Sequence, residues 1–107
     1  MTARKRRPAK RATTTVRGQW QHVIFRVRHT PDYLIKDTNH LELIVIEPKR
    51  EPLPITETGY LSHFDCDSGI ASAKAGLEFF LAWIDREAKT KRWQKLDNKR
   101  RQLELFT

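Results

Sequence analysis

Three side chains that can bind a metal stand at alternate positions in the second half of the chain: His63, Asp65 and Asp67. Imidazole and carboxylate groups bind divalent metals. Because side chains alternate between the two faces of a strand, the three share one side only if a strand continues to Asp67. We favour a strand end followed by a helix cap, since Asp67 and Ser68 each offer a side-chain oxygen to the free amides of a first helical turn. The sequence therefore predicts no metal site here.

A second set of residues with chemical potential is the pair Pro31-Asp32, followed after a predicted strand by Glu47-Pro48-Lys49. These letters resemble the Pro-Asp…Glu-x-Lys nuclease motif. The resemblance implies that Asp32 and Glu47 hold a magnesium ion while Lys49 assists the attacking water. However, Pro48 interrupts the strand that normally carries the last two residues on one face, and Asp32 lies in a turn. A divalent-metal nuclease is therefore kept as the alternative function.

Cys66 is the only cysteine, so no internal disulfide can form and a reducing, cytoplasmic setting fits. The sequence places no histidine and base around it in a pattern that activates a thiolate, and an isolated cysteine is more often packed than catalytic. There is no glycine-rich phosphate loop, and no apolar run approaches the length of a membrane span. We expect no enzyme activity and no cofactor.

The net charge of +8 is concentrated at the two ends of the chain. Residues 1–18 hold seven basic side chains and no acid, and residues 89–101 hold seven against one acid. Cationic segments with little to bury stay disordered when free and lie along nucleic-acid phosphates. We therefore predict a disordered basic arm over residues 1–18, and nucleic-acid contacts by Arg4, Lys5, Arg6, Arg7, Lys10, Arg11, Lys91, Arg92, Lys95 and Lys99.

The middle of the chain predicts three strands, of which the first alternates apolar and polar side chains and the second is the most apolar. They span Gln19 to Thr30, His40 to Glu47, and Ile55 to Phe64, the last interrupted by Gly59 where close packing or a bulge is expected. Short connections favour an antiparallel meander.

Two arginines of the first predicted strand, Arg26 and Arg28, lie on its polar face. They can add to a nucleic-acid surface, but we favour cross-strand pairs with Glu42 or Glu47.

The C-terminal part of the chain, from Ser68 onward, predicts one long helix with an apolar stripe at three- and four-residue steps. Gly76 lowers helix stability and indicates a close approach by a strand. Phe79 and Trp83 form a second apolar face, so we expect the helix to be covered on two sides, by the sheet and by a loop or the partner chain of a homodimer. Trp93 stands among cations and could stack on a base, but we favour packing against its own domain.

The last residues, Gln102-Leu103-Glu104-Leu105-Phe106, resemble the short linear motif by which bacterial proteins dock onto the DNA polymerase sliding clamp. By this resemblance Leu105 and Phe106 fill an apolar pocket on the clamp, Leu103 takes the aliphatic position, and the Gln102 amide hydrogen-bonds nearby. The alternative is that the leucines and Phe106 pack back onto the domain.

Together these patterns predict an α+β fold: a three-stranded antiparallel sheet packed on a long C-terminal helix, with one domain over residues 19–101 and an apolar tag over residues 102–107. The strand segment from Ile55 to Phe64, with Gly59-Tyr60-Leu61-Ser62-His63-Phe64, is similar to small uncharacterised bacterial proteins of the mobile-element type. We predict a cytoplasmic, nucleoid-associated accessory protein that binds DNA, or RNA, through its basic ends and the sliding clamp through its tag. A protein-interaction module without nucleic acid is the other alternative.

Overall fold

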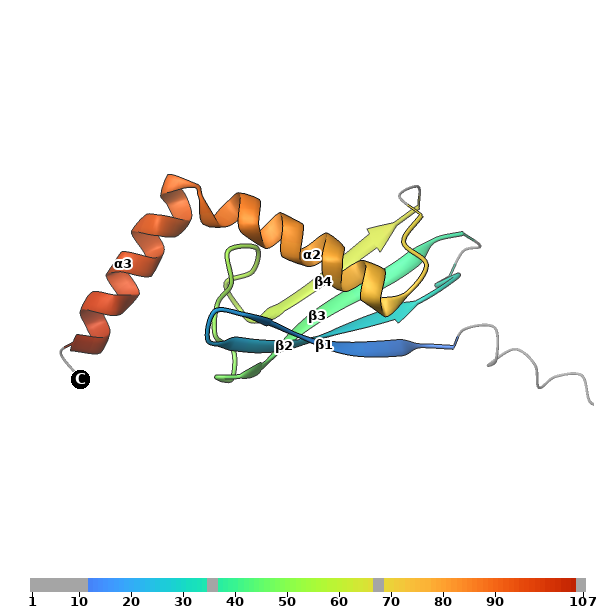
Figure 1. Cartoon of the computed structure of the whole chain (residues 1–107), viewed down its shortest axis with the longest axis horizontal. Coiled ribbons are helices and arrows are strands. Elements are labelled where there is room, and N and C mark those ends of the chain that lie inside the picture. Colours follow the sequence, from blue (N-terminus) through green and yellow to red (C-terminus); the bar gives the residue numbers. More distant parts are fainter. Residues whose placement is uncertain (1–11, 35–36, 67–68, 106–107) are drawn as a thin grey trace, which may run out of the picture.

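The computed structural model describes residues 12–34, 37–66 and 69–105. Within them, four strands form one antiparallel sheet in the order β1-β2-β3-β4, and two helices follow. The elements are β1 (Thr14–Trp20), β2 (Val23–Thr30), β3 (Asn39–Glu47), β4 (Tyr60–Asp65), α2 (Ala73–Ala88) and α3 (Lys91–Leu105). Figure 1 shows α2 lying across the sheet and α3 turning away from the body at the corner between the helices. The α+β class and the antiparallel meander followed by helix are as predicted.

The sheet has four strands instead of three because β1 begins inside the predicted disordered arm. Thr14, Thr15 and Val16 have β-branched side chains that suit a strand, and β1 pairs with β2 along its whole length. The turn between them contains only Gln21 and His22, and it lacks the Asn-Gly or Asp-Gly pair that commonly marks a hairpin. The first predicted strand, Gln19 to Thr30, therefore combined the end of β1 with β2. Residues 1–11 of the arm lie outside the described residues.

The last strand begins at Tyr60, later than the predicted start at Ile55. The preceding loop folds back on itself through two backbone hydrogen bonds between Leu53 and Thr56, of 2.8 and 3.0 Å. The predicted close packing at Gly59 is confirmed, because its φ is +82° and an added Cβ would stand 2.8 Å from the backbone of the neighbouring turn. Local pairing inside the loop thus replaces the first part of the predicted strand.

The predicted single helix is two helices, separated at Lys89 and Thr90. The N–H of Lys89 donates to the carbonyl of Arg86 and the N–H of Thr90 donates to that of Glu87, and these two bonds end α2. The hydroxyl of Thr90 accepts a hydrogen bond from the N–H of Trp93 at 3.2 Å, which satisfies a free amide in the first turn of α3. The helical periodicity continues through this break, so the sequence pattern alone did not reveal it.

The start of α2 also differs from the prediction. Its N-cap is Ser72, whose hydroxyl accepts from the N–H of Ala75 at 3.1 Å. The predicted caps, Asp67 and Ser68, precede this cap and lie outside the described residues.

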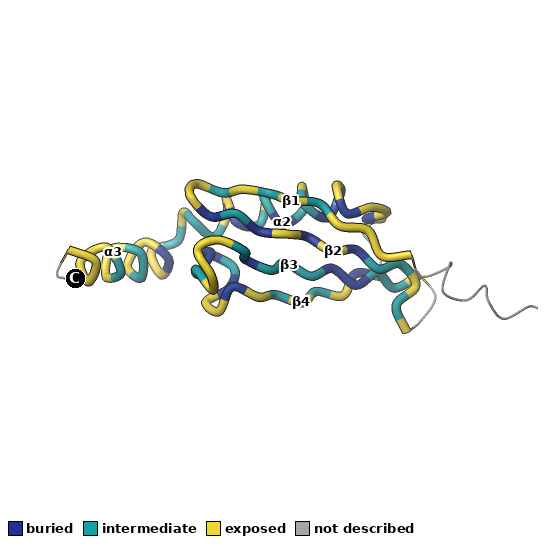
Figure 2. The backbone as a smooth tube through the Cα atoms, turned by 90° about the horizontal axis from the view of Figure 1, so that it is seen from below, coloured by how far each residue is buried: buried dark blue, intermediate teal, exposed yellow. Residues whose placement is uncertain are grey.

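The core lies between α2 and the inner face of the sheet. Figure 2 shows buried positions alternating with exposed or intermediate ones along the central strands β2 and β3, as expected for a sheet with one covered face. The predicted close approach at Gly76 is confirmed, because an added Cβ would stand 2.8 Å from Leu41 Cδ2. The second apolar face of α2 was predicted to meet a loop or a partner chain, but it contacts the sheet, where Phe79 and Trp83 lie against His63 of β4 with ring centroids 5.0 and 5.9 Å apart.

Candidate nucleic-acid interface

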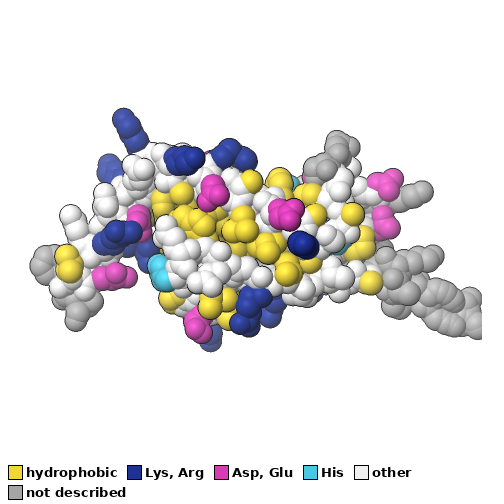
Figure 3. Space-filling view, viewed as in Figure 1, with side chains coloured by type: hydrophobic (Ala, Val, Ile, Leu, Met, Phe, Trp, Pro, Cys, Tyr) yellow, Lys and Arg dark blue, Asp and Glu magenta, His cyan; other side chains and the backbone are white. Residues whose placement is uncertain are grey.

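The helix α3 projects from the body and carries most of the predicted C-terminal cations. Figure 2 shows it as mainly exposed, with burial near its start. In Figure 3 the lysine and arginine side chains gather over the corner between α2 and α3 and along α3. Because the first contacts of α3 with the body determine where these cations lie, its anchoring residues are part of the site.

The first anchor is Trp93, which is 6% exposed. Its ring meets Trp20 at the end of β1 edge-on, with centroids 6.2 Å apart and planes at 67°. Such an edge-to-face pair adds to the stabilisation that burying an indole provides. The prediction that Trp93 packs against its own domain, in preference to stacking on a base, is therefore confirmed.

The second anchor is the carboxylate of Glu51, in the loop after β3. It accepts a hydrogen bond from the guanidinium of Arg100, and its Oε2 lies 3.1 Å from His22 Nε2 in the β1–β2 turn. Arg100 also lies 3.5 Å from Asp97 one turn earlier in α3. This cluster ties the middle of α3 to two loops at one end of the sheet.

Three lysines of α3 remain exposed beyond these anchors: Lys91, Lys95 and Lys99. They recur every fourth residue, which places them along one side of the helix over about 12 Å. Within the described residues no carboxylate pairs with any of them, whereas Arg92 lies 3.7 Å from Glu57 and 3.9 Å from Glu87. The lysines therefore present unneutralised charge to solvent.

A groove of about 280 Å³ runs beside α3, between the helix and the loop before β4. Arg92, Lys95, Leu96 and Lys99 line its helix side and Glu57 the other. Arg92 also donates to the carbonyl of Pro54 at 3.4 Å. The groove thus offers an apolar floor between cationic side chains, the combination that a phosphate with an attached sugar or base can occupy.

The predicted tag forms the last turn of α3. Gln102 is exposed, and Leu103 and Leu105 are 60% and 83% exposed, so neither leucine packs back onto the domain. Phe106 lies outside the described residues. Residues two apart on a helix point in nearly opposite directions, so Leu103 and Leu105 do not present one joint surface while this turn is helical.

The open face of the sheet, opposite α2, carries further arginines. Arg17 of β1 stands directly across from Arg26 of β2, and both are exposed. Like charges directly opposite destabilise a sheet, and within the described residues neither arginine has a carboxylate partner. Arg28 lies 3.5 Å from Glu42 on β3, which confirms the predicted pair for Arg28, while Arg26 is opposite Ile44 instead of an acid.

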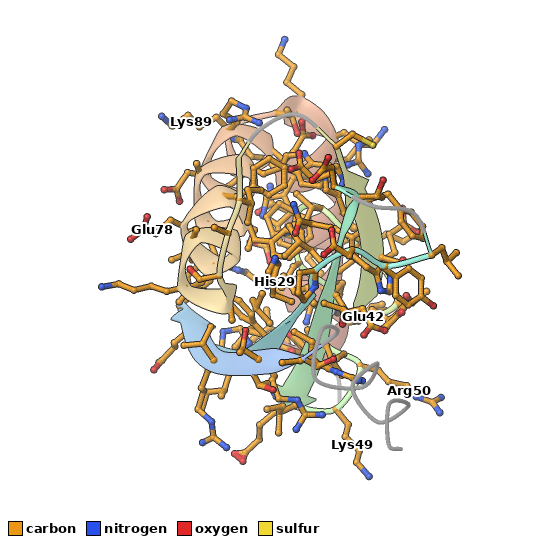
Figure 4. All side chains as sticks on the ribbon, turned by 90° about the vertical axis from the view of Figure 1, so that its right-hand side faces the viewer. His29, Glu42, Lys49, Arg50, Glu78 and Lys89 are labelled. Atoms are coloured by element: carbon orange, nitrogen blue, oxygen red, sulfur yellow. The ribbon has the colours of Figure 1, made fainter. Side chains whose placement is uncertain are left out.

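Tyr60 lies on the same open face and is 45% exposed. Its hydroxyl donates to Glu42 Oε2 at 2.6 Å, so its ring is held across the sheet. This hydrogen bond raises the pKa of Tyr60 above its usual value, and partial burial and the nearby negative charge add to the effect. Figure 4 shows Glu42 on the side of the sheet away from α2, whereas Glu78 projects from the helix side.

The second exposed ring of this face is Phe64, four residues along β4 and 53% exposed. It stacks on His40 with centroids 4.7 Å apart, and His40 in turn stacks on Tyr33 at 4.5 Å. His40 is further fixed by a 2.7 Å hydrogen bond between its Nε2 and Ser62 Oγ. The result is a supported aromatic surface with one side of Phe64 open to solvent.

The residues of the nuclease alternative are not brought together. Asp32 follows β2 and its Oδ1 accepts from the N–H of Asp37 at 2.8 Å, which fixes a turn. Glu47 ends β3 at the opposite end of the sheet, about 26 Å away at ~3.3 Å per residue along the strand. Lys49 lies beyond Glu47, at that same far end, and Figure 4 shows it pointing away from α2. Two carboxylates must lie within a few ångströms to share one ion, so these cannot.

The three side chains considered as metal ligands in the second half of the chain also have other surroundings. His63 is covered by Phe79 and Trp83, and Asp65 is buried. Asp67 lies outside the described residues. Across the described ranges no group of three histidine, cysteine or acidic side chains has the arrangement that holds a metal.

Cys66 shares a polar groove of about 590 Å³ with His29 at the end of the sheet where β2 meets β3. His29 is buried, and its Nε2 lies 2.9 Å from Asn39 Oδ1. The thiol of Cys66 is exposed and stands 3.7 Å from the hydroxyl of Thr38. No contact between the imidazole and the thiol is present in the described structure, so a cysteine–histidine pair is not assembled.

Sequence reasoning missed Arg17, Tyr60 and Phe64 as surface residues of one face. The signal for the aromatics was present, because Tyr60, Ser62 and Phe64 alternate with Leu61 and His63. Arg17 was hidden because β1 was assigned to the disordered arm.

Fold and surface define a small basic α+β domain, with one face of its sheet covered by a helix and the other open. The family model described as the KlcB third domain matches residues 13–93, which is 81 of the 107 residues, so this chain belongs to the KlcB third-domain family. KlcB is a protein of plasmids and mobile elements, in keeping with the resemblance noted for the segment from Ile55 to Phe64. No curated protein and no solved structure matches the chain.

The family match starts just before β1 and ends at Trp93. It therefore contains the whole sheet and α2, while nearly all of α3 and its exposed end follow it. Neither helix in the described ranges combines the length and apolar character needed to cross a membrane.

Proposed function

We propose that this domain is a nucleic-acid-associated accessory module that contacts phosphates through α3 and the basic N-terminal arm, and that docks on the DNA polymerase sliding clamp through residues 102–106. The proposal assigns it no catalytic step. The observation that carries it is the row Lys91, Lys95 and Lys99 on a projecting helix, exposed and without carboxylate partners in the described structure.

Phosphate contacts by such a row are electrostatic and carry no sequence information. Each contact releases condensed counterions, so the logarithm of the binding constant falls with the logarithm of salt by about 0.9 per phosphate on duplex DNA. The groove beside α3 supports the same role, because Lys95 and Lys99 line it and have no carboxylate partner within the described residues. Affinity that depends steeply on salt and little on sequence is therefore expected.

The test is a fluorescence-anisotropy titration of duplex DNA over a series of salt concentrations. The variant Lys95→Gln with Lys99→Gln should lower the salt slope by about 1.8, since two phosphate contacts are lost. The control, Lys74→Gln, removes an exposed cation at the start of α2, far from the corner with α3, and should leave the slope unchanged. A wild-type slope near zero, or equal slopes in both variants, would contradict the proposal.

Docking on the clamp is supported by the exposure of Leu103 and Leu105 and by the motif that they belong to. Because the last turn of α3 makes them point to different sides, engagement of one pocket requires that turn to unwind. Helix ends fray readily, so this step requires little free energy. Accessibility of the tag is thus compatible with its helical form in the isolated domain.

A pull-down with purified bacterial sliding clamp tests this part separately. Leu105→Ala with Phe106→Ala should abolish recovery of the clamp. Leu34→Ala, which truncates an exposed leucine elsewhere, should leave recovery unchanged. Equal recovery by the wild type and the tag variant would remove the clamp from the proposal while leaving the phosphate contacts standing.

A further inference from the structure

We propose that the open face of the four-stranded sheet binds single-stranded nucleic acid, with bases stacked on Tyr60 and Phe64 and phosphates held by Arg17 and Arg26. This inference rests on the proposed function in taking nucleic acid as the ligand. It adds a second binding surface, made by residues other than those of α3. It also names the class of nucleic acid that this surface binds, a single strand.

The two aromatic rings are the first observation. Tyr60 and Phe64 lie on the same face of β4, about 13 Å apart along the strand, so one base cannot cover both. Each is about half exposed and each is held in place, Tyr60 by its hydrogen bond to Glu42 and Phe64 by its stack on His40. Rings that are fixed before binding lose little entropy when a base stacks on them.

The arginines are the second observation, and it is independent of the rings. Arg17, Arg26, Ile44 and Tyr60 follow one another across β1, β2, β3 and β4 in a single row of the register. The unpaired Arg17 and Arg26 repel each other across the first two strands, and a bound phosphate removes that repulsion. Arg26 and Tyr60 are two strands apart, so their backbones are separated by about 10 Å. Because both side chains are long, one nucleotide can reach from the arginine to the ring.

Charge on this face selects the occupant. The carboxylate of Glu42 is already engaged by Arg28 and by the Tyr60 hydroxyl, so it adds little free negative charge. Lys49 and Arg50, exposed in the loop after β3, also point away from α2 (Figure 4). A polyanion with exposed planar groups fits this combination of cations and rings, and bases are free to stack only in a single strand.

The experiment compares two 20-nucleotide single strands, oligo-dT and an abasic strand of the same length, by fluorescence anisotropy at equal salt. Both strands offer phosphates, but only the first offers bases. Wild type should bind oligo-dT at least tenfold more tightly than the abasic strand, since stacking contributes about that factor or more for each base. It should also prefer oligo-dT over a duplex, in which the bases are already stacked.

Variants then assign the effect to the sheet face. Tyr60→Leu with Phe64→Leu keeps apolar side chains on the strand but removes the rings, so it should bind both strands with nearly equal affinity. Tyr60→Phe keeps the ring and should retain the preference. Arg17→Gln with Arg26→Gln should weaken binding to both strands by a similar factor, because it removes phosphate contacts alone.

The remaining outcomes of these experiments each refute one of the two proposals or both. Equal wild-type affinity for oligo-dT and the abasic strand overturns the stacking inference, and if Lys95→Gln with Lys99→Gln still lowers the salt dependence, the proposed function survives. A preference for oligo-dT that the leucine variant retains also overturns the inference, because the bases then bind elsewhere. Loss of self-association in the leucine variant with unchanged binding assigns the face to a second copy of the chain. Absence of binding to any strand refutes both proposals.

Discussion

Replacing Trp93 with alanine should detach α3 while leaving the rest of the domain folded. Truncating a buried tryptophan costs about 3–5 kcal/mol, and loss of the edge-on contact with Trp20 is part of that cost. After the change, α3 keeps its polar contacts with the body, those of Arg100 with Glu51 and of Arg92 with Glu57 and the Pro54 carbonyl. An isolated helix of 15 residues is marginally stable in water. Most of the loss should therefore appear as opening of α3.

Native-state hydrogen exchange read by mass spectrometry or NMR measures this directly. A loss of about 3 kcal/mol makes the amides of α3 exchange about 100-fold faster, because each 1.4 kcal/mol corresponds to a factor of ten. Amides of α2 and β3 should exchange at nearly the wild-type rate. Gln94→Ala, at an exposed neighbouring position of α3, is the matched control and should change little.

Two results would refute this reasoning. If the amides of α2, β3 and α3 all accelerate by the same factor, α3 belongs to the cooperative core and Trp93 stabilises the whole fold. If α3 exchanges at its wild-type rate, the polar contacts of Arg100 and Arg92 are sufficient to hold it. Trp93→Phe separates burial from the pair with Trp20, and should give an intermediate rate.

Three further changes test other parts of the structure. Gly18→Ala should lower the free energy of unfolding by about 1–3 kcal/mol in urea denaturation, because its Cβ would clash with Leu77 Cδ1; unchanged stability would show that the core yields there. Thr90→Ala should cost about 1 kcal/mol, since its hydroxyl caps α3, whereas Thr90→Ser should restore most of that loss. In a background without the other tyrosine, ultraviolet titration should show Tyr60 ionising above pH 10.0, and Glu42→Gln should lower that pKa. Because the folded pKa is raised, the stability from this contact is complete below pH 10.0 and is lost as pH rises through the folded value; an unchanged titration in Glu42→Gln would contradict this.

The sequence predicted the structure best where a single hydrophobic pattern was present and no other pattern competed with it. The second predicted strand coincides with β3 to within one residue at its start, because it is the most apolar run of the middle of the chain and Pro48 stops it. The approach of a strand at Gly76 was also predictable, since a glycine inside an apolar helical stripe suggests a neighbouring backbone or side chain. The pair between Arg28 and Glu42 followed from cross-strand complementarity.

Predictions failed where long-range contacts outweigh local pattern. β1 carries few apolar residues and becomes a strand because β2 supplies its hydrogen-bond partners. The break at Thr90 interrupts no periodicity, and what fixes it is the contact of Trp93 with Trp20, more than seventy residues earlier in the chain. For the same reason the nuclease-like motif suggested a site at Asp32 and Glu47, although the length of β3 separates these two residues at opposite ends of the sheet.

By itself, the amino-acid sequence determined the class of fold, the most apolar strand, the apolar face of the first helix and the uneven distribution of charge. These are local properties, set by side-chain chemistry and by the periods of helix and strand. Only the tertiary structure decided that Arg17 faces Arg26, that Tyr60 and Phe64 share their open surface, and that α3 leaves the body with its lysines exposed. Register and helix direction follow from which distant residues pack together, and no local pattern encodes that choice.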